Sequence, residues 1–196
     1  MRRSNISHDE YERYVKTVAN LLLYRAAEDL PLEDHDVPRK GGDPYRERVV
    51  TVPIVLVPVM RAGLPMEEEV ERYFSSASVG FIEAERDEGS GQAWVPSCKL
   101  PLLKGAKTFL MEQVVATGDT VCKVLEVIKG EYQAEDVILF CCIAAPQGIS
   151  RIFAEHPELK IFLGHLDETL DDNYFVYPGI GDAGDRTFGI YHKPNE

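Results

Sequence analysis

From residue 49 onward, short runs of apolar and often β-branched residues alternate with segments that have helical periodicity. This alternation limits the fold more than any other feature of the sequence. The apolar runs span residues 49–59, 77–82, 107–111, 137–143 and 160–163, and the helical patterns span residues 66–74, 121–129 and 149–156. Strands that alternate with helices form βαβ units, whose strands run parallel and whose helices cover the sheet. We therefore predict an α/β fold with a mainly parallel sheet flanked by helices.

The residues before this region predict one long helix and then a segment without regular periodicity. Ser7 and Glu10 have the spacing of a capping box, and apolar residues follow with helical periodicity from residue 11 to residue 22. Pro31 is expected to end the helix. Residues 33–48 are charged and rich in Gly, Pro and Asp, so we expect an exposed loop or an irregular hairpin there.

Length, charge and cysteine usage limit the class of protein. With 196 residues, 44% of them apolar, the chain can bury one sizeable core, so we expect residues 1–196 to form a single domain. A net charge of −12 disfavours nucleic acid and anionic membranes as partners, so a bound anion needs a local basic pocket. The apolar runs are too short to span a bilayer and no signal sequence is evident, so a cytoplasmic location is expected. The four cysteines lack metal-ligand spacing and are expected to be buried free thiols: Cys98, Cys122, Cys141 and Cys142.

Ligands of parallel sheets sit beyond the carboxyl ends of the strands, and the segment after the third predicted strand offers a phosphate site. Residues 112–120 read EQVVATGDT and lead into a helix. The N–H groups at the start of that helix, its dipole and the hydroxyls of Thr117 and Thr120 suit a phosphate monoester. Glu112, at the strand end, is placed to hold ribose hydroxyls. In the alternative interpretation, Asp119 or Thr120 only caps the helix.

Cations follow other predicted strands, in places where they can meet a diphosphate. Arg61 lies in a tight turn after the first strand, and Arg86 opens a loop at residues 86–92 that is flexible enough to act as a lid. Lys99, in the segment that follows this loop, is a further candidate cation. In the alternative interpretations, Arg61 forms a surface ion pair, Lys99 is a surface lysine and the loop after Arg86 is a solvated hairpin. Residues 144–148 are small enough to admit a ligand or another loop, or to form a tight turn.

The C-terminal residues 177–189 read YPGIGDAGDRTFG and contain four glycines and two aspartates. Such a segment has little side-chain bulk, so its backbone can approach a flat polar ligand closely. It contains the pattern GxGxxG, but only twelve residues follow Gly184, too few for the helix and second strand of a dinucleotide-binding unit. The segment is then either a base-recognition loop or a glycine-rich turn.

Taken together, the motifs resemble those of uracil phosphoribosyltransferase in order and spacing. The resemblance runs from about residue 21 to residue 189, and the motifs are specific in combination. They are VPVMRAGL at 57–64, ERD at 85–87, KLP at 99–101, ATG at 116–118, AAPQG at 144–148 and PGIGDAGDR at 178–186. The last of them is nearly a signature of the family.

The resemblance implies a fold, a reaction and partners. The fold would be that of type I phosphoribosyltransferases, with a core at about residues 49–164 and a small hood from about residues 1–48 and 165–196. Uracil and 5-phosphoribosyl 1-diphosphate (PRPP) would give UMP and diphosphate, a step of pyrimidine salvage. Mg²⁺ would be carried by the diphosphate of PRPP, without metal ligands from the protein. A homodimer or higher homo-oligomer is expected.

The resemblance also implies a role for individual residues. Arg61, Arg86 and Asp182 would be catalytic. The residues that would bind PRPP are Arg61, Arg86, Glu112, Gln113, Val114, Val115, Ala116, Thr117, Gly118, Asp119, Thr120 and Asp182. Those that would bind uracil are Val176, Gly181, Asp182 and Ala183.

The sequence departs from the family pattern at several of these positions. The family usually has Asp-Pro in place of Glu112 and Gln113, glycine in place of Asp119 and Pro65, and tyrosine in place of Glu85. We expect Asp119 to cap the helix rather than to face the phosphate. Two alternatives stay open: a catalytically weak homologue that binds nucleobases or nucleotides for regulation, and a phosphoribosyltransferase for another base.

Overall fold

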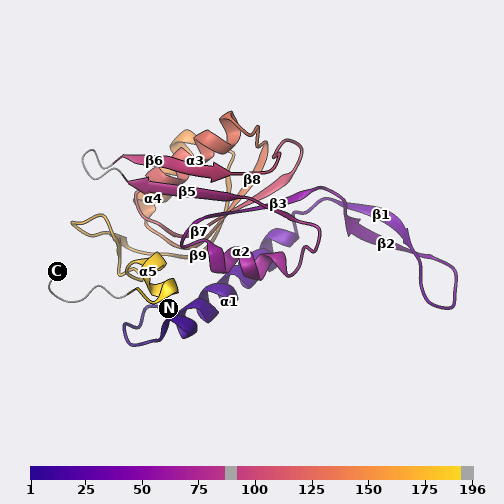
Figure 1. Ribbon diagram of the computed structural model, residues 1–196, viewed down its shortest axis with the longest axis horizontal. Helices are drawn as coiled ribbons and strands as arrows, with labels where there is room; N and C mark the ends of the chain where they lie inside the picture. Colours follow the sequence, from indigo (N-terminus) through magenta and orange to yellow (C-terminus); the bar gives the residue numbers. More distant parts are fainter. Residues whose placement is uncertain (87–91, 191–196) are drawn as a thin grey trace.

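A seven-stranded sheet forms the centre of the protein in the computed structural model, which describes residues 1–86 and 92–190 (Figure 1). Its strands are β3 (Ile54–Met60), β4 (Ser78–Val79), β5 (Phe81–Arg86), β6 (Ala93–Lys99), β7 (Lys107–Val115), β8 (Asp136–Ala144) and β9 (Lys160–Leu166). They lie in the order β6-β5-β3-β7-β8-β9, and β4 pairs with β3. Among these strands, β6 alone runs antiparallel to its neighbour, so the predicted mainly parallel sheet is confirmed.

Helices cover both faces of the sheet and divide the core into two halves. The helices α1 (His8–Ala27) and α2 (Leu64–Glu71) pack on one face, and α3 (Asp119–Gly130) and α4 (Pro146–Glu155) pack on the other. Phe109 and Met111 of β7 belong to the half with α1, whereas Leu110 between them belongs to the half with α3. Successive residues of a strand point to opposite faces, so a strand covered on both faces is apolar throughout.

The predicted N-terminal helix is confirmed as α1. Ser7 caps it by accepting a hydrogen bond from the N–H of Glu10 at 3.2 Å. Tyr11, Val15 and Ala19 follow at helical spacing and are almost fully buried in the half of the core that also contains Met66 of α2. This amphipathic pattern makes α1 a layer on the central sheet.

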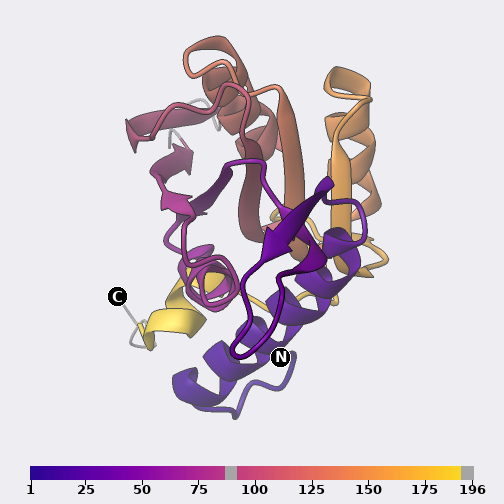
Figure 2. The same cartoon turned by 90° about the vertical axis from the view of Figure 1, so that its right-hand side faces the viewer.

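The segment after α1 forms an antiparallel hairpin of β1 (Leu32–Val37) and β2 (Tyr45–Val50). The hairpin projects from the body of the molecule in Figure 1, and Figure 2 views it along that direction. The predicted strand at 49–59 therefore starts too early, because its first two residues pair with β1 and the buried strand begins at Ile54. Pro53 lies between the two strands and has no N–H to donate to a ladder.

Three strands of the sheet, β5, β7 and β9, run three or four residues beyond their predicted ends, and one strand was not predicted. β7 continues four residues beyond the predicted end, because it stays paired with β8 as far as Val115. The sequence did not predict β6 at all. Its side chains alternate between exposed and half-buried, and it contains Pro96, so it lacks the apolar run by which the other strands are recognised.

The C-terminal part returns to the start of the chain. A short two-stranded sheet, β10 (Thr169–Leu170) and β11 (Val176–Tyr177), is followed by α5 (Ala183–Phe188). Figure 1 shows α5 beside the N-terminal end of α1, which it contacts. All four cysteines are free, as predicted, and three of them are buried, whereas Cys98 is only half-buried. Among the described residues, no helix combines the length and the apolar character that a membrane crossing requires.

Four phenylalanines form a chain of ring contacts through the half of the core under α1. Phe109 lies at its centre, with its ring centroid 5.8 Å from that of Phe74 and 5.2 Å from that of Phe140. Phe162 extends the chain, with its centroid 5.9 Å from that of Phe140. Aromatic pairs at such distances stabilise a core beyond the area they bury.

We predict that Phe109→Ala lowers the free energy of unfolding by about 3–5 kcal/mol, because it opens a cavity at the centre of this chain. Urea denaturation measures the change. Phe153→Ala on α4 is the matched control: Phe153 is 42% exposed, and the loss should stay below about 1 kcal/mol. Equal losses in the two variants would contradict the central position of Phe109.

Candidate functional site

The carboxyl ends of the parallel strands meet at one edge of the sheet, and the turn after β7 lies there against the start of α4. Gly118 caps α3 with a φ of +87°, a conformation that favours glycine. A Cβ at Gly118 would lie 2.7 Å from the carbonyl oxygen of Gly148, and one at Gly148 would lie 2.3 Å from that of Ala116. Of the outcomes considered for residues 144–148, the close approach of another loop is the one observed.

Glu112 lies inside β7 rather than in the turn. The prediction that it stands at the strand end is wrong, since β7 continues for three more residues. The residue is buried, and its carboxyl accepts a hydrogen bond from the N–H of Gln113 at 2.9 Å. Burial raises the pKa of Glu112 to about 8, against the opposing effect of backbone hydrogen bonds. At neutral pH its carboxyl is therefore mainly protonated.

Gln113 is fully buried and connects three parts of the chain. Its side-chain oxygen accepts a hydrogen bond from the hydroxyl of Tyr11 at 2.7 Å. Its amide nitrogen donates to the carbonyl of Ala62 at 2.6 Å and to the hydroxyl of Thr187 at 2.9 Å. Both amide hydrogens are thus used within the protein, and they tie β7 to the turn after β3 and to α5.

Asp119 does not cap α3, so the capping prediction is wrong. Gly118 occupies the N-cap position without a side-chain hydrogen bond, and Asp119 is the first residue of the helix. One carboxylate oxygen of Asp119 accepts a hydrogen bond from the Thr117 hydroxyl at 2.7 Å. The other lies 3.0 Å from the Nε of Arg151 on α4. Arg151 was not among the site residues predicted from the sequence.

Arg61 follows β3 and reaches the C-terminal segment. Its guanidinium lies 3.0 Å from a carboxylate oxygen of Asp185, and its side chain is about half exposed. The N–H of Asp185 in turn donates to the carboxylate of Asp182 at 2.8 Å. A Cβ at Gly63 would lie 2.4 Å from the carbonyl oxygen of Met111, so glycine lets this turn approach β7. Two predicted site residues from distant parts of the chain, Arg61 and Asp182, are thereby brought together.

The structure separates the other two predicted cations. Arg86, predicted to follow its strand and open the lid at residues 86–92, is instead the last residue of β5 and pairs with Ala93. Residues 87–91 of that predicted lid lie outside the described residues. Lys99 pairs with Phe81 at the beginning of β5. Because β6 is antiparallel, Lys99 lies at the opposite edge of the sheet and is an exposed surface lysine, the alternative considered for it.

The glycine-rich C-terminal segment forms a tight turn and then α5. Gly179 has a φ of +59°, and a Cβ there would lie 1.9 Å from the carbonyl oxygen of Val176. Gly181 also has a positive φ, of +73°. Asp182 caps α5, and Ala183 begins it with a buried side chain. The backbone of this segment is thus held in one specific conformation.

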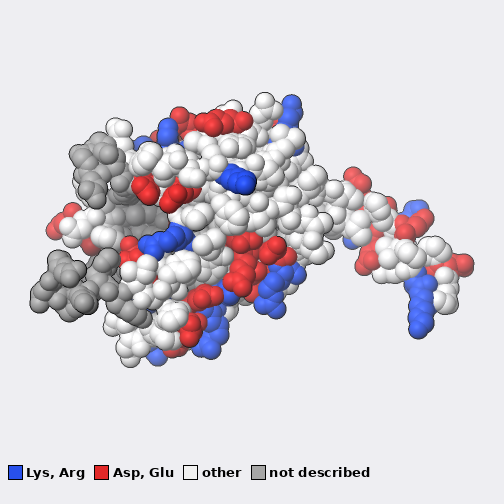
Figure 3. Space-filling model, viewed as in Figure 1, with Lys and Arg blue, Asp and Glu red and all other residues white. Residues whose placement is uncertain are grey.

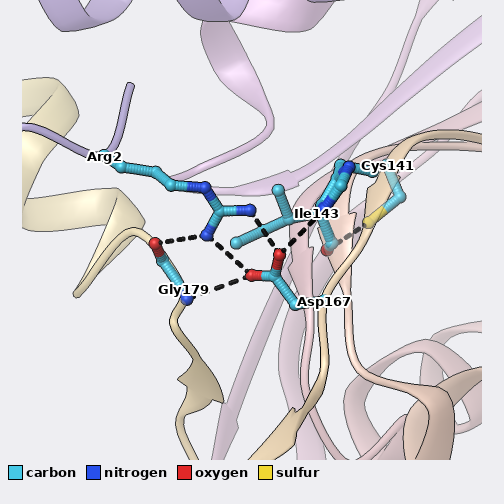
Figure 4. A network of polar contacts seen from close by, with 6 residues as sticks. Arg2, Cys141, Ile143, Asp167 and Gly179 are labelled. Atoms are coloured by element: carbon cyan, nitrogen blue, oxygen red, sulfur yellow. Dashed lines mark hydrogen bonds and ion pairs between the residues drawn. The ribbon is translucent and has the colours of Figure 1, made fainter.

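A buried carboxylate that sequence reasoning missed holds this turn in place. Asp167 follows β9, and its fully buried side chain binds the guanidinium of Arg2 (Figure 4). It also accepts a hydrogen bond from the N–H of Gly179 at 3.0 Å, while Arg2 donates to the Gly179 carbonyl at 2.8 Å. The hydrogen bond from Arg2 lowers the pKa of Asp167. The sequence contains no direct signal for it, because the predicted strand ends at residue 163 and Asp167 lies four positions beyond that end.

Arg186 binds the same turn from its other side. Its guanidinium donates to the carbonyls of Ile180 at 2.7 Å and of Arg3 at 2.6 Å, and it lies 4.5 Å from the centre of the Tyr11 ring. Arg2 and Arg186, the basic residues beside this turn, thus each bind their own partners within the protein. On the face of the molecule shown in Figure 3, basic side chains lie among acidic ones over α1 and α2 and form no continuous basic surface.

Comparisons with known proteins agree with this architecture. The family model for uracil phosphoribosyltransferase matches residues 1–190. The uracil phosphoribosyltransferase of Malacoplasma penetrans (strain HF-2) is 32% identical over 194 residues, which cover 96% of this chain and 91% of that protein. The chain belongs to the uracil phosphoribosyltransferase family. A solved structure of a protein from Aquifex aeolicus is similar with a TM-score of 0.91 and 32% identity, over 98% of this chain and 92% of the other.

More distant structures share the fold alone. A hypoxanthine phosphoribosyltransferase from Staphylococcus aureus is 12% identical and has a TM-score of 0.54, over 81% of this chain and 76% of the other. The predicted type I phosphoribosyltransferase fold is thereby confirmed. In this member of the uracil phosphoribosyltransferase family, the departures at Glu112, Gln113 and Asp119 each have a defined partner within the protein.

The raised pKa of Glu112 makes stability depend on pH. The folded protein keeps the Glu112 proton up to about pH 8, whereas an unfolded chain releases it near about pH 4.3. The unfolded state therefore binds fewer protons between these values, and stability falls as the pH rises. Glu112→Gln removes this loss, so its stability relative to the unmodified protein should rise by up to about 1.4 kcal/mol per pH unit. Urea denaturation at about pH 5 and about pH 8 tests this, and parallel changes in both proteins would contradict it.

The pairing of Arg2 with Asp167 generates a second prediction. Arg2→Ala leaves a fully buried carboxylate without its cation, so the free energy of unfolding should fall by about 1–3 kcal/mol. Arg3→Ala is the control, since Arg186 uses only the backbone carbonyl of Arg3, and its effect should stay within about 0.5 kcal/mol. Because Arg2 lowers the pKa of Asp167, the difference between the variants should shrink as acid protonates that carboxylate. A difference that is constant down to about pH 2 would argue against the pair.

Proposed function

We propose that this chain transfers the phosphoribosyl group of PRPP to uracil and so forms UMP and diphosphate. The observation that carries the proposal is the contact from Arg61 through Asp185 to Asp182. It places the cation expected at the diphosphate beside the segment expected to hold the base, in a chain of the uracil phosphoribosyltransferase family. Both substrates would then meet at the edge where the parallel strands end.

The donor would lie along the carboxyl ends of β7 and β3. The start of α3 supplies N–H groups and the positive end of a helix dipole for the 5-phosphate. Arg61 and Arg86 would hold the diphosphate. The donor segment of β7 and the following turn comprises Glu112, Gln113, Val114, Val115, Ala116, Thr117, Gly118, Asp119 and Thr120. Since the Gln113 amide is engaged within the protein, its part would be to position this segment.

Uracil would be held mainly by backbone groups of Val176 and of Gly181 to Ala183. The glycine-rich turn is anchored on one side by Asp167 and on the other by Arg186, so its N–H and C=O groups have fixed directions. Fixed backbone groups can match the alternating acceptors and donor of the uracil edge. Cytosine reverses part of that pattern, and a buried unpaired group disfavours it.

The chemistry needs positioned charge and no nucleophilic side chain. The bond from the anomeric carbon to the diphosphate breaks, a bond to N1 of uracil forms, and uracil gives up its N1 proton. Positive charge develops on the ribose and negative charge on the leaving diphosphate. Arg61 and Arg86 would stabilise the leaving group, while Asp182 would lie beside the donor.

Magnesium would enter with the donor. Diphosphate oxygens are hard ligands of the kind that Mg²⁺ prefers, and this ion usually retains several waters. The protein carboxyls nearby are engaged: Glu112 is mainly protonated at neutral pH, and Asp185 pairs with Arg61. The described residues do bring Cys122, Glu155 and His156 close together, but none of these belongs to the proposed donor segments. The side chains present therefore fit an ion held by the substrate.

We also expect the chain to form a homodimer or higher homo-oligomer in the cytoplasm. The hairpin of β1 and β2 projects without a core of its own and exposes Leu32 and Tyr45. An isolated two-stranded hairpin is marginally stable in water, so a second copy is a reasonable neighbour for it. Free cysteines are typical of a reducing compartment. Light scattering of the purified protein measures the oligomeric state.

The proposed reaction is tested by following UMP formation from uracil and PRPP. Arg61→Ala should lower kcat/KM for PRPP by about 100-fold or more, because it removes a cation from the leaving diphosphate. Arg72→Ala is the control, since Arg72 is an exposed arginine just after α2 that forms an ion pair with Glu69, and kcat/KM should change by less than about twofold. Cytosine should be used at least about 100-fold less efficiently than uracil. Uracil or UMP binding without any turnover would favour the regulatory alternative.

A further inference from the structure

Asp119 places a negative charge where the proposed donor needs its 5-phosphate. It is the first residue of α3, and its side chain is about one quarter exposed. The first turn of a helix favours an anion, but a carboxylate already there repels a second one. For the turn to accept a phosphate dianion, the charge of Asp119 must be balanced by a neighbouring group.

Arg151 is that neighbour. Its Nε lies 3.0 Å from one carboxylate oxygen of Asp119, and its Nη2 lies 3.4 Å from Glu155. The Thr117 hydroxyl donates to the other oxygen of Asp119 at 2.7 Å. Both oxygens of Asp119 are thus directed toward groups of the protein.

The packing of α4 explains why Arg151 reaches Asp119. α4 begins at Pro146, and Gly148 in its first turn lies in backbone contact with Ala116 and Gly118. This contact sets the start of α4 directly against the turn that precedes α3. Arg151 follows Gly148 by three residues and so lies on the same side of the helix. The arginine is therefore aimed by backbone packing rather than by a flexible loop.

The pair borders an open pocket of about 260 Å³ that a ligand can reach. Lys123 lines the same pocket, but it pairs with Glu126 at 2.7 Å. Among the described residues, Arg151 is the one cation that forms an ion pair with Asp119. The balance of charge at the start of α3 thus depends on Arg151.

We propose that Arg151 is a positioning residue for PRPP: it neutralises Asp119 and holds its carboxylate away from the phosphate. The inference rests on the proposed function. Arg151 acts through Asp119, so its importance should vanish when position 119 carries no charge. A residue that bound the phosphate directly would matter whatever stood at position 119.

A double-mutant cycle tests this dependence. The unmodified chain, Arg151→Ala, Asp119→Asn and the double variant are compared at one low ionic strength for the KM of PRPP, the KM of uracil and kcat. Arg151→Ala alone should raise the KM of PRPP by about tenfold and leave the KM of uracil unchanged. In the Asp119→Asn background the same replacement should change the KM of PRPP by less than about twofold. Arg151→Lys should restore most of the affinity, because it keeps the charge.

Lys123→Ala is the matched control, because it removes a cation from the same pocket without touching Asp119, and it should leave the KM of PRPP unchanged. The inference would be overturned if Arg151→Ala raised the KM of PRPP equally in both backgrounds, or if Lys123→Ala raised it as much. The proposed function would still stand in that case, provided that the unmodified chain forms UMP. A fall in thermal midpoint with unchanged KM would assign Arg151 a purely structural role and also overturn it. Absence of UMP formation by the unmodified chain would overturn the proposed function, and this inference with it.

Discussion

Parallel pairing of β3, β7 and β8 is the constraint on which the rest of the structure depends. It brings the carboxyl ends of these strands to one edge, so the turns that follow them become neighbours. Each turn then needs glycine where another backbone approaches, as at Gly63 against β7 and at Gly118 against Gly148. The small residues in the motifs are therefore required first by packing between turns, and the space they leave is where a ligand can approach the backbone.

A second set of contacts closes the ends of the chain over this edge. Arg2 and Asp167 hold the glycine-rich turn at Gly179, and Arg186 holds it at Ile180. The Gln113 amide connects the same region to β7 from within the core. Because these hydrogen bonds involve charged or fully buried groups, each is stronger than an exposed contact, and together they define the shape of the proposed base site.

The sequence predicted most elements of the fold, and it failed where the signal was weak or not local. The buried strands and amphipathic helices were found because apolar periodicity follows directly from burial. β6 was missed because an edge strand that is half exposed has no apolar run, and the ends of β7 and of the first predicted strand were misplaced because pairing with a neighbour decides where a strand stops. Of the candidate site, the segments were predicted from their motifs, but their internal contacts were not.

By itself the sequence determined the class of fold, the order of elements and the family motifs, since each is encoded in a short stretch of chain. Only the tertiary structure decided which side chains meet. Arg2 and Asp167 are 165 positions apart, and Asp119 finds Arg151 rather than a cap because two glycines let α4 approach the turn. The tertiary structure also decides that Glu112 is protonated, because burial between packed layers, and not the residue type, raises its pKa.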